Sequence, residues 1–376
     1  MKKQVIIFSL LPWDSNLLHR EHMLAKNLKK LGYKVYFVEK RSINPTNIQK
    51  FTYSRRIDHG IEIITCKCLP YSKGVIKAIY KFNDSVLTKQ LKKVFELFDD
   101  DSWLIASNPY WIKAIEASRQ ARQILAYDIS DDLAGFATNN RWAKRLNEYE
   151  KEMIESADVV FVTTDTLKAK TNNAPTFKIE NGVDLELFGE SINILNNKFP
   201  RPIAGYIGGI YQWVDLDLIK EAAMKNSKVT FILVGPTNRR KEVNRISKLK
   251  NVHYLGEIDR NEISNYFASL DIGLVPFVNE HEYPRLSTVN SNKLFQYMYF
   301  GYPVITTSYK QTISLKNLIE VCDNKKEFIS RIGDSLTEEA NNKRQDRIDY
   351  AKTHSWERQT LKIVEILKKT KRMLQK

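Results

Sequence analysis

The sequence predicts an α/β protein with two doubly wound, Rossmann-like domains that face each other. The chain begins with a β-α-β pattern, in which the apolar segments QVIIFSL and KVYFVE flank a helix with leucines on one face. Strand-like and helix-like segments then alternate, which is typical of parallel sheets with right-handed crossovers. The alternation starts again after a polar stretch, LELFGESINILNNKFPRP, so we expect two similar domains.

Each half of the chain supplies the strands of one predicted sheet. In the first half the expected segments are QVIIFSL, KVYFVE, IEIITCKCL, SWLIASNP, QILAYDIS, DVVFVTT and FKIENGVD. In the second half they are IAGYIGGI, VTFILVG, NVHYLG, DIGLVPF and PVITT. We place an N-terminal domain at residues 1–184 and a C-terminal domain at residues 200–354. A last helix, residues 355–376, is expected to start at Ser355, which can cap it, and Glu357 favours its first turn.

The bulk composition limits the classes of function. The formal net charge is +15, which favours polyanions such as nucleic acid, anionic lipid or phosphorylated substrates. No zinc-finger spacing or RNP-like aromatic motif indicates nucleic acid, so we expect no nucleic-acid partner. The three cysteines form no metal-binding or disulfide pattern, and no apolar run is long enough to span a membrane. We therefore expect a reduced, cytoplasmic protein.

A basic amphipathic helix is predicted over residues 73–98. Lys73, Lys77 and Lys81 recur every four residues and therefore share one helical face. Such a face can rest on the anionic inner surface of a membrane, where each basic residue contributes about 1 kcal/mol. The alternative is an ordinary solvated helix face.

The residues that follow predicted strands are the first candidates for a binding site, because ligands of doubly wound sheets bind beyond the carboxyl ends of the strands. These candidates are Trp13, Asp14, Asn108, Asp128, Asp131, Asp132, Gly208, Gly209, Gly235, Pro236 and the segment from Pro276 to Lys293. His19 lies early in the first predicted helix and is close to the same edge, although a solvated or packed helix face is the simpler interpretation.

Three carboxylates follow one strand in the segment AYDISDDLAGF. Asp128, Asp131 and Asp132 can act as a general base or orient sugar hydroxyls. The alternative is structural, because Ser130 or Asp131 can cap the helix that follows.

The turn GYIGGIYQW and the segment SNKLFQYMYFG suit an anion. Gly208 and Gly209 allow a ligand to approach the backbone closely. Ser291 or Asn290 is a natural N-cap, and Lys293 in the first helical turn is unfavourable for the helix dipole unless an anion binds there. The alternatives are a simple tight turn and a lysine that extends into solvent.

These motifs resemble GT-B-fold glycosyltransferases that use nucleotide-sugar donors, and more narrowly the bacterial teichuronic-acid and polysaccharide biosynthesis branch. The likeness spans nearly the whole chain. It rests on the segments PWDSNLLHREHMLAKNLKKLGYKVYFVE, YDISDDLAGF, SADVVFVTTDTL, KIENGVDLELF, SNKLFQYMYFGYPVITT and HSWERQTLKIVEIL. The second-to-last of these resembles the donor-binding helix and strand of the family.

The resemblance implies a role for each candidate. It implies donor binding by the C-terminal domain, acceptor binding by the N-terminal domain, and a terminal helix that crosses back to the N-terminal domain. The donor would be a nucleotide diphosphate sugar, UDP-linked by our expectation, with no metal ion or other cofactor. The implied donor residues are Gly208, Gly209, Gly235, Pro236, Arg285, Ser291, Asn292, Lys293 and Gln296, and the implied acceptor residues are Trp13, Asp14, His19 and Asn108.

The chain departs from the family pattern at specific positions. Gln296 stands where the family usually has glutamate, and Thr288 stands where many members are acidic. The basic pair that often follows the first strand of the second domain is absent from GGIYQWVD. Gln296 can still hydrogen-bond a ribose through its amide. We hypothesise that Arg285, Arg239 or Arg240 supplies the missing positive charge.

The expected function is sugar transfer to a lipid-linked or growing bacterial surface polysaccharide, by a hexosyl-type, metal-independent enzyme at the inner face of the cell membrane. Asp128, Asp131 and Asp132 are the expected catalytic group. The alternative is a non-catalytic donor-binding or scaffold subunit of a polysaccharide assembly complex. A nucleic-acid binder is favoured by charge alone.

Overall fold

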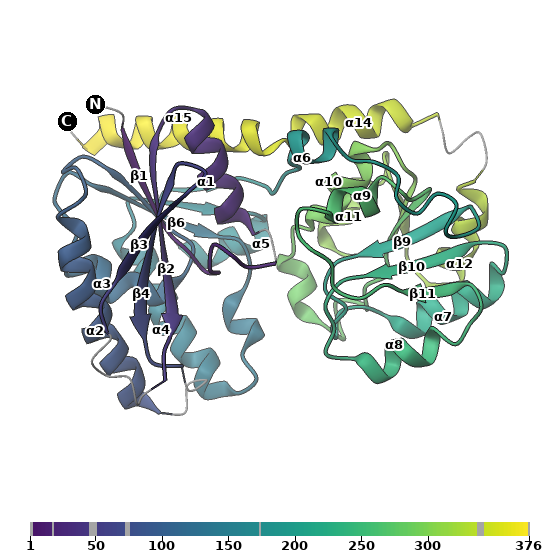
Figure 1. Cartoon of the computed structure of the whole chain (residues 1–376), viewed down its shortest axis with the longest axis horizontal. Helices are drawn as coiled ribbons and strands as arrows, with labels where there is room; N and C mark the ends of the chain where they lie inside the picture. Colours follow the sequence, from purple (N-terminus) through teal and green to yellow (C-terminus); the bar gives the residue numbers. More distant parts are fainter. Residues whose placement is uncertain are drawn as a thin grey trace. The chain divides into compact units, whose positions relative to one another are not determined.

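The structure, a computed structural model, describes residues 3–16, 19–44, 51–71, 76–172, 174–336 and 342–374. The chain divides into two compact units. The first unit comprises Met1–Glu180 with Gln359–Lys376, and the second comprises Asn181–Arg358. Each is an α/β unit built on a sheet of its own (Figure 1).

The first unit contains an eight-stranded sheet in the order β3-β4-β2-β1-β5-β6-β7-β8. Its strands are β1 (Gln4–Phe8), β2 (Lys34–Ser42), β3 (Ser54–Asp58), β4 (Ile61–Cys68), β5 (Trp103–Ala106), β6 (Ile124–Ile129), β7 (Val159–Val162) and β8 (Thr176–Lys178). Strand β3 pairs antiparallel with β4, whereas the other pairings are parallel. The strand order reverses between β1 and β5, so the carboxyl ends of these strands are the switch point of this sheet.

Strand β3 was not predicted from the sequence. Ile57 is its only strongly apolar residue and is 73% exposed, so the segment lacks the apolar alternation that indicates a strand. It forms because the main chain of β4 offers an edge for pairing.

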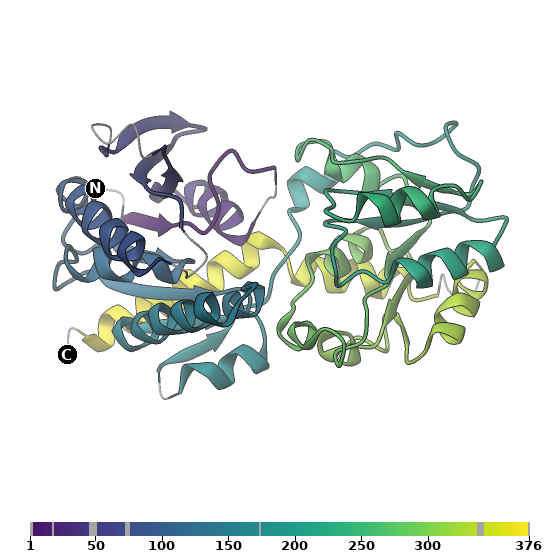
Figure 2. The same ribbon diagram turned by 90° about the horizontal axis from the view of Figure 1, so that it is seen from below.

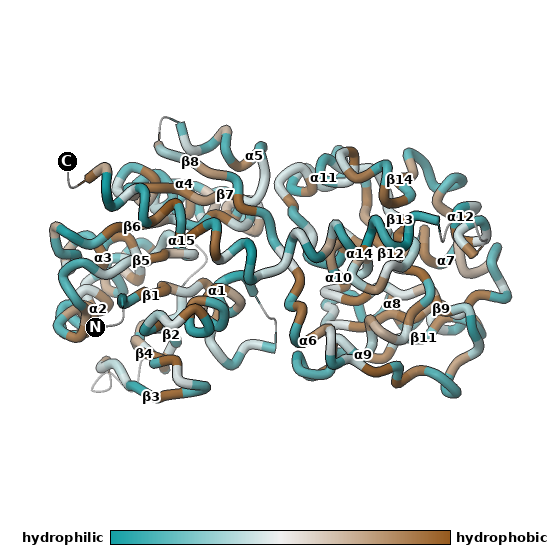
Figure 3. The backbone as a smooth tube through the Cα atoms, turned by 90° about the horizontal axis from the view of Figure 1, so that it is seen from above, coloured by the Kyte–Doolittle hydropathy of each residue, from teal (hydrophilic) through white to brown (hydrophobic). Residues whose placement is uncertain are grey.

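Helices cover both faces of the first sheet (Figures 1 and 2). They are α1 (Arg20–Lys30), α2 (Lys77–Phe95), α3 (Ile112–Glu116), α4 (Asn140–Ser156), α5 (Asp165–Lys168) and α15 (Trp356–Leu374). Helices α2, α3 and α4 share one hydrophobic core with alternate residues of β1 and β2. Helix α15 is amphipathic, and its hydrophilic and hydrophobic residues alternate along its length in Figure 3. The Oγ of Ser355 accepts a hydrogen bond from the Arg358 N–H at 3.3 Å, which confirms the predicted cap.

The second unit contains a six-stranded parallel sheet in the order β11-β10-β9-β12-β13-β14. Its strands are β9 (Ile203–Ile207), β10 (Thr230–Val234), β11 (Val252–Tyr254), β12 (Ile272–Val275), β13 (Val304–Thr307) and β14 (Glu320–Cys322). Its helices are α6 (Leu185–Gly189), α7 (Leu216–Lys225), α8 (Arg240–Ile246), α9 (Ile263–Phe267), α10 (Asn292–Tyr299), α11 (Lys310–Ile313), α12 (Lys325–Asp334) and α14 (Arg344–Thr353). This is the Rossmann strand order, with its switch point between β9 and β12.

The buried phenol of Tyr297 stabilises the switch point of the second sheet. The Oη of Tyr297, on α10, accepts a hydrogen bond from the Ile207 N–H at 3.1 Å and donates to the Gly205 carbonyl at 3.0 Å. Strands β12 and β9 pair directly only at Ile272↔Ala204 and Gly273↔Gly205, so the phenol satisfies backbone groups of β9 that would otherwise lack partners. A Cβ at Gly273 would lie 2.3 Å from Cγ of Tyr297, so a glycine is needed there.

We predict that Tyr297→Phe lowers the free energy of unfolding by about 1–3 kcal/mol, because it leaves a buried N–H and a buried carbonyl of β9 without their partner. Urea denaturation measures the change. Tyr299→Phe is the matched control, since the Tyr299 hydroxyl forms no hydrogen bond with the described residues. Equal stability of the two variants would contradict the role of the Tyr297 hydroxyl.

Candidate functional site

Two glycines with positive φ shape the carboxyl edge of the second sheet. Gly208 follows β9 with φ +142°, and Gly235 follows β10 with φ +133°. A Cβ at Gly208 would lie 2.2 Å from Cε of Lys293, and a Cβ at Gly235 would lie 2.2 Å from the Gly208 carbonyl oxygen. Side chains at these two positions would therefore displace the lysine or the turn. The structure brings the predicted glycine turn and the predicted lysine into direct contact.

Lys293 is the second residue of α10, and its side chain reaches back over the end of β9. Its Nζ lies 5.4 Å from the ring centroid of Tyr206 and 6.0 Å from that of Phe277, which are both buried. The ammonium thus lies beside aromatic rings near the start of a helix, where the backbone N–H groups also carry partial positive charge. An anion at this position would interact with both.

The start of α10 differs in one detail from the prediction. Ser291 is the N-cap residue, but its side chain makes no capping hydrogen bond, and its N–H donates to Oε1 of Gln311 at 2.7 Å. Asn290 does not cap α10 either, because its Oδ1 accepts from the Asn181 N–H at 2.8 Å. The buried Oδ1 of Asn292 has no hydrogen-bond partner among the described residues. The predicted N-cap position at Ser291 is therefore confirmed, but its side chain does not cap the helix, and α10 begins with polar groups available to a ligand.

The remaining predicted donor residues lie around this edge. Gln296 is half-buried, one turn after Asn292 on α10. Nη1 of Arg285 donates to Oη of Tyr283 at 2.7 Å. The Pro236 carbonyl accepts from the Ile210 N–H at 2.8 Å, which ties the two glycine turns together.

Arg239 has a structural role that the sequence did not reveal. Its Nη1 donates to the carbonyls of Tyr211 at 3.0 Å and Val214 at 2.7 Å, and its Nε lies 3.0 Å from Oε1 of Glu242. The guanidinium is thus occupied in fixing the loop after Gly209. The hypothesis that Arg239 supplies phosphate-binding charge is not supported by these contacts.

Aromatic side chains occupy the loop in which the family often has its basic pair. The rings of Tyr211 and Trp213 lie 4.9 Å apart, and the rings of Trp213 and Tyr283 lie 6.0 Å apart. The aromatic residues are visible in the sequence as IYQW. We did not predict a functional role for them, because aromatic residues after a strand are more often part of a core than of a binding site.

A buried ion pair joins α1 to the carboxyl end of β6 in the first unit. Nε of Arg20 donates to Oδ1 and Oδ2 of Asp128 at 2.9 and 2.8 Å, and both residues are almost fully buried. Nη1 of Arg20 also donates to the Glu180 carbonyl at 3.1 Å. Asp128, predicted as catalytic, therefore has both oxygens engaged by Arg20. The sequence did not single out Arg20, because an arginine beside two histidines on a helix looks solvent-exposed.

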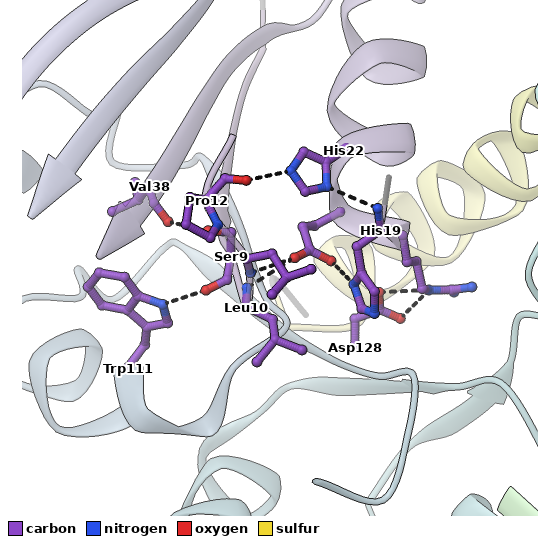
Figure 4. Close-up of polar contacts among 11 residues, drawn as sticks. Ser9, Leu10, Pro12, His19, His22, Val38, Trp111 and Asp128 are labelled. Atoms are coloured by element: carbon purple, nitrogen blue, oxygen red, sulfur yellow. Dashed lines mark hydrogen bonds and ion pairs between the residues drawn. The ribbon is translucent and has the colours of Figure 1, made fainter. Parts of the chain in front are cut away.

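A second network connects the first loop to the start of α1 (Figure 4). The His19 ring hydrogen-bonds through Nδ1 to Oε2 of Glu21. Oε1 of Glu21 accepts from the Leu10 and Leu11 N–H groups at 3.2 and 2.9 Å. Nε2 of His22 donates to the Pro12 carbonyl at 2.9 Å, while its Nδ1 accepts from the His19 N–H at 3.2 Å. These hydrogen bonds connect the backbone of Leu10, Leu11 and Pro12 to side chains at the start of α1.

The pKa values in this network are strongly shifted. Burial alone would lower the pKa of His19, but attraction and hydrogen bonding to Glu21, with smaller contributions from Asp131 and Asp128, raise it to about 9. Burial would raise the pKa of Glu21, but His19, His22 and the Leu11 N–H lower it to about 2. At neutral pH His19 is therefore an imidazolium beside a carboxylate.

The other two aspartates of the predicted catalytic group occupy different environments. Asp131 is half-buried, and its attraction to the His19 imidazolium contributes to the raised pKa of His19. Asp132 forms an ion pair with Lys170 and precedes a short 3-10 helix without capping it through its side chain. The N-cap position of this helix is thus Asp132, not Ser130 or Asp131 as the structural alternative expected.

The remaining predicted acceptor residues have structural partners. Trp13 is 2% exposed, and its indole N–H donates to Oδ2 of Asp58 at 2.7 Å. Asp14 forms an ion pair with Arg41 at 2.5 Å. The Asn108 side chain caps a 3-10 helix by accepting from the Tyr110 N–H at 3.0 Å. These contacts leave Trp13 and Asn108 little exposed surface.

Lys40, near the end of β2, was missed by the sequence reasoning. Its buried Nζ has no hydrogen-bond partner in the described part of the chain and lies 4.8–5.5 Å from the rings of Tyr110, Tyr71 and Trp111. Burial lowers its pKa to about 8, against weak opposition from Cys68 and Asp84. Lys40 lies in the polar tetrapeptide EKRS, so the local sequence does not indicate that its side chain is buried.

The described residues contain no group of three or more His, Cys, Asp or Glu side chains arranged to hold a metal ion. None of the helices within the described ranges is both long and apolar enough to cross a membrane.

Comparisons with known proteins agree with this architecture. The sequence model of the family described as "Glycosyl transferases group 1" matches residues 201–338. These residues form a group 1 glycosyltransferase domain. A curated relative, TuaH of Bacillus subtilis (strain 168), an inferred teichuronic acid biosynthesis glycosyltransferase, is 29% identical over 185 residues. That alignment covers 46% of this chain and 46% of TuaH, so less than half of each is compared.

Solved structures show that the chain has the two-domain GT-B fold of glycosyltransferases. A sucrose-phosphate synthase from Thermosynechococcus elongatus matches with a TM-score of 0.70, 13% identity and coverage of 98% of this chain and 99% of that one. An α,α-trehalose 6-phosphate synthase from Burkholderia multivorans matches with a TM-score of 0.73, 10% identity and 98% coverage of each chain. An E. coli trehalose-6-phosphate structure bound with UDP-2-fluoro glucose matches with a TM-score of 0.72, 10% identity and coverage of 98% and 99%. The predicted fold class and family resemblance are thus confirmed, and the glycosyltransferase domain contains the Gly208 turn and α10.

We predict that His19 in the folded chain titrates near pH 9, because Glu21 holds its proton. The stability that protonation of His19 contributes is complete below about pH 6.5 and is lost as the pH rises through about 9. NMR of imidazole nitrogens across pH 5–10 measures the titration. His253, whose pKa is lowered by burial, is an internal reference. Glu21→Gln should bring the His19 pKa down, and an unchanged value in that variant would contradict the assignment.

Proposed function

We propose that this chain transfers a hexosyl group from a nucleotide diphosphate sugar to a lipid-linked or growing bacterial surface polysaccharide. The observation that carries the proposal is the contact between Lys293 and the Gly208 turn, at the start of α10 and at the switch point of the second sheet. The teichuronic acid assignment of TuaH supports a polysaccharide acceptor.

The donor diphosphate would be held by Lys293 and the backbone N–H groups at the start of α10. The lysine charge and the helix dipole would stabilise the negative charge that develops on the departing diphosphate. We propose that this makes a metal ion or other cofactor unnecessary. A uridine nucleotide is our preferred donor, in line with the UDP-2-fluoro glucose bound by the E. coli structure of the same fold. Transfer that stops in the presence of EDTA and resumes with Mg²⁺ would contradict metal independence.

Gln296 and Arg285 would complete the donor site. The Gln296 amide, one turn along α10 from Asn292, is suited to hydrogen bonds with ribose hydroxyls. Arg285 is the candidate for additional positive charge, because Arg239 is occupied by the loop after Gly209. The aromatic rings of Tyr211 and Trp213 would pack against the sugar or its acceptor.

In the first unit we assign the acceptor base to Asp131 among the three predicted aspartates. Asp128 is bound by Arg20 and Asp132 pairs with Lys170, whereas Asp131 is half-buried beside the imidazolium of His19. His19 would bind an oxygen of the acceptor, and Asp131 would accept the proton of the attacking hydroxyl. Transfer that survives Asp131→Asn at an unchanged rate would remove this assignment.

We predict that Lys293→Met weakens the binding of UDP-sugars by about 10–100-fold, because a charge-assisted hydrogen bond to phosphate contributes about 1.5–3 kcal/mol. Isothermal titration calorimetry with a panel of nucleotide diphosphate sugars measures the change. Lys316→Met removes an exposed lysine of the same unit and is the matched control. Equal affinity of both variants for the bound donor would contradict the site.

A non-catalytic donor-binding subunit is the second candidate, and the observation that favours it is Gln296. A neutral amide replaces the glutamate expected from the family, so a charge-assisted bond to ribose becomes an ordinary one. Release of UDP from a donor that the chain binds, in the presence of a bacterial lipid-linked glycan fraction, distinguishes the two. Binding without turnover would favour the subunit, and Gln296→Glu would then be the variant to test for recovered transfer.

We also propose that the chain is cytoplasmic and binds the inner membrane surface peripherally through α2. Lys77 and Lys81 are exposed one turn apart, and the exposed Ile76 and Phe82 flank them with apolar surface. Lys73 lies outside the described residues. Co-sedimentation with anionic liposomes tests this, using Lys77→Glu with Lys81→Glu and, as a control in the second unit, Lys225→Glu with Lys228→Glu. Equal sedimentation of both double variants would show that α2 is not the membrane-binding element.

A further inference from the structure

The first unit contains a pocket beside α4, which we call the α4 pocket. Its volume is about 230 Å³. Glu150 and Ile154 are buried residues of its lining, and Lys170 and Asn172, which follow α5, also line it. The volume is below the range of drug-sized sites, about 300–1,000 Å³, so a single sugar ring suits the pocket better than a nucleotide.

The spacing of residues along α4 brings one face of this helix to the pocket. Asn147, Glu150, Lys151, Ile154 and Glu155 are separated by steps of three and four residues in turn, which places them on the same side of a helix. Asn147, Lys151 and Glu155 are exposed. They therefore form a polar rim around the buried carboxylate and the buried isoleucine.

The charged side chains of the pocket are paired with one another. Oε2 of Glu150 lies 3.6 Å from Nζ of Lys170, and Oε1 of Glu155 lies 3.8 Å from Nζ of Lys151. A phosphate in the pocket would approach the two carboxylates, and a cation would approach the two ammonium groups. These pairs therefore favour a ligand without a net charge.

The pocket offers hydrogen-bond donors and acceptors side by side. Oε1 of Glu150 accepts from the Tyr127 hydroxyl at 3.2 Å, whereas Oε2 is farther from Lys170 than an ordinary hydrogen bond and can accept one from a ligand. The amides of Asn147 and Asn172 can both donate and accept, and the lysines can donate. Sugar hydroxyls also donate and accept, and the C–H groups of a sugar ring can pack on Ile154.

Lys170 connects the α4 pocket to the proposed acceptor site. Its Nζ forms ion pairs with both Glu150 and Asp132, and Asp132 is the neighbour of the proposed acceptor base Asp131. Burial raises the pKa of the Glu150 carboxyl, Lys170 opposes this shift, and the negative charge of Asp132 adds to it. One ammonium group thus separates the pocket from the group of aspartates.

We propose that the α4 pocket binds a neutral sugar residue, in its pyranose form, that belongs to the acceptor glycan and lies beyond the sugar whose hydroxyl attacks the donor. The inference rests on the proposed function for the identity of the glycan as acceptor. The binding of a neutral sugar itself follows from the paired charges, the two amides and the apolar floor.

Saturation-transfer difference NMR of the full chain tests sugar binding. The probes are the methyl glycosides of glucose, galactose, mannose and N-acetylglucosamine, and glucose 6-phosphate is the charged comparison. We expect at least one methyl glycoside to bind in the presence of excess UDP, and glucose 6-phosphate to bind more weakly than methyl glucoside. No binding by any methyl glycoside, or displacement of the bound one by UDP, overturns the inference.

Asn147→Ala with Asn172→Gly removes two amides of the rim, and glycine accommodates the φ of +50° at residue 172. This double variant should weaken binding of the methyl glycoside by at least about tenfold, because the hydrogen bonds of both amides are lost. The matched control is Asn244→Ala with Asn197→Gly, two exposed asparagines of the second unit, of which Asn197 has φ +68°. Equal affinity of the two double variants overturns the inference.

Kinetics with a bacterial lipid-linked glycan fraction tests the link to the acceptor. The rim variant should raise the KM for the glycan by about tenfold and leave kcat and the affinity for the donor unchanged. An unchanged KM would overturn the assignment of the bound sugar to the acceptor. If the chain transfers no sugar to any glycan, the proposed function fails while NMR still reports on the pocket, so the two failures are distinguishable.

Discussion

The second unit of the protein depends on the placement of the Tyr297 hydroxyl between β9 and β12. This phenol bonds the Ile207 N–H and the Gly205 carbonyl where the two strands separate. Its ring fits because residue 273 is glycine. The phenol therefore fixes the rotation of α10 about its own axis. Leu294 and Met298 enter the core, Gln296 stays partly accessible, and Lys293 reaches the Gly208 turn.

The first unit is organised by buried charges rather than by one hydroxyl. Arg20 with Asp128, and His19 with Glu21, connect α1 to β6 and to the loop after β1. Each charge is costly to bury and is tolerated because its partner and backbone groups are within hydrogen-bond distance. Lys40 is the contrast, since its amine is surrounded by aromatic rings and its pKa falls. The polar network thus positions residues 10–12, which the proposed acceptor would meet.

The residues of the proposed donor site could be placed together from the sequence because they lie close to strand ends. Gly208 follows an apolar strand directly, and Ser291 to Lys293 precede an apolar helical face, so local patterns were sufficient. The role of Arg239 was not predictable, since its partners are carbonyls 25 and 28 residues away. Strand β3 was missed for a similar reason, because pairing with β4 rather than its own apolar pattern makes it a strand.

The sequence by itself determined the alternation of strands and helices, the division into two α/β units and the family resemblance, because apolar periodicity and turn residues act over short distances. Only the tertiary structure decided which charges are buried. Arg20 and Asp128 are 108 residues apart, and their pairing depends on strand order rather than on any local pattern.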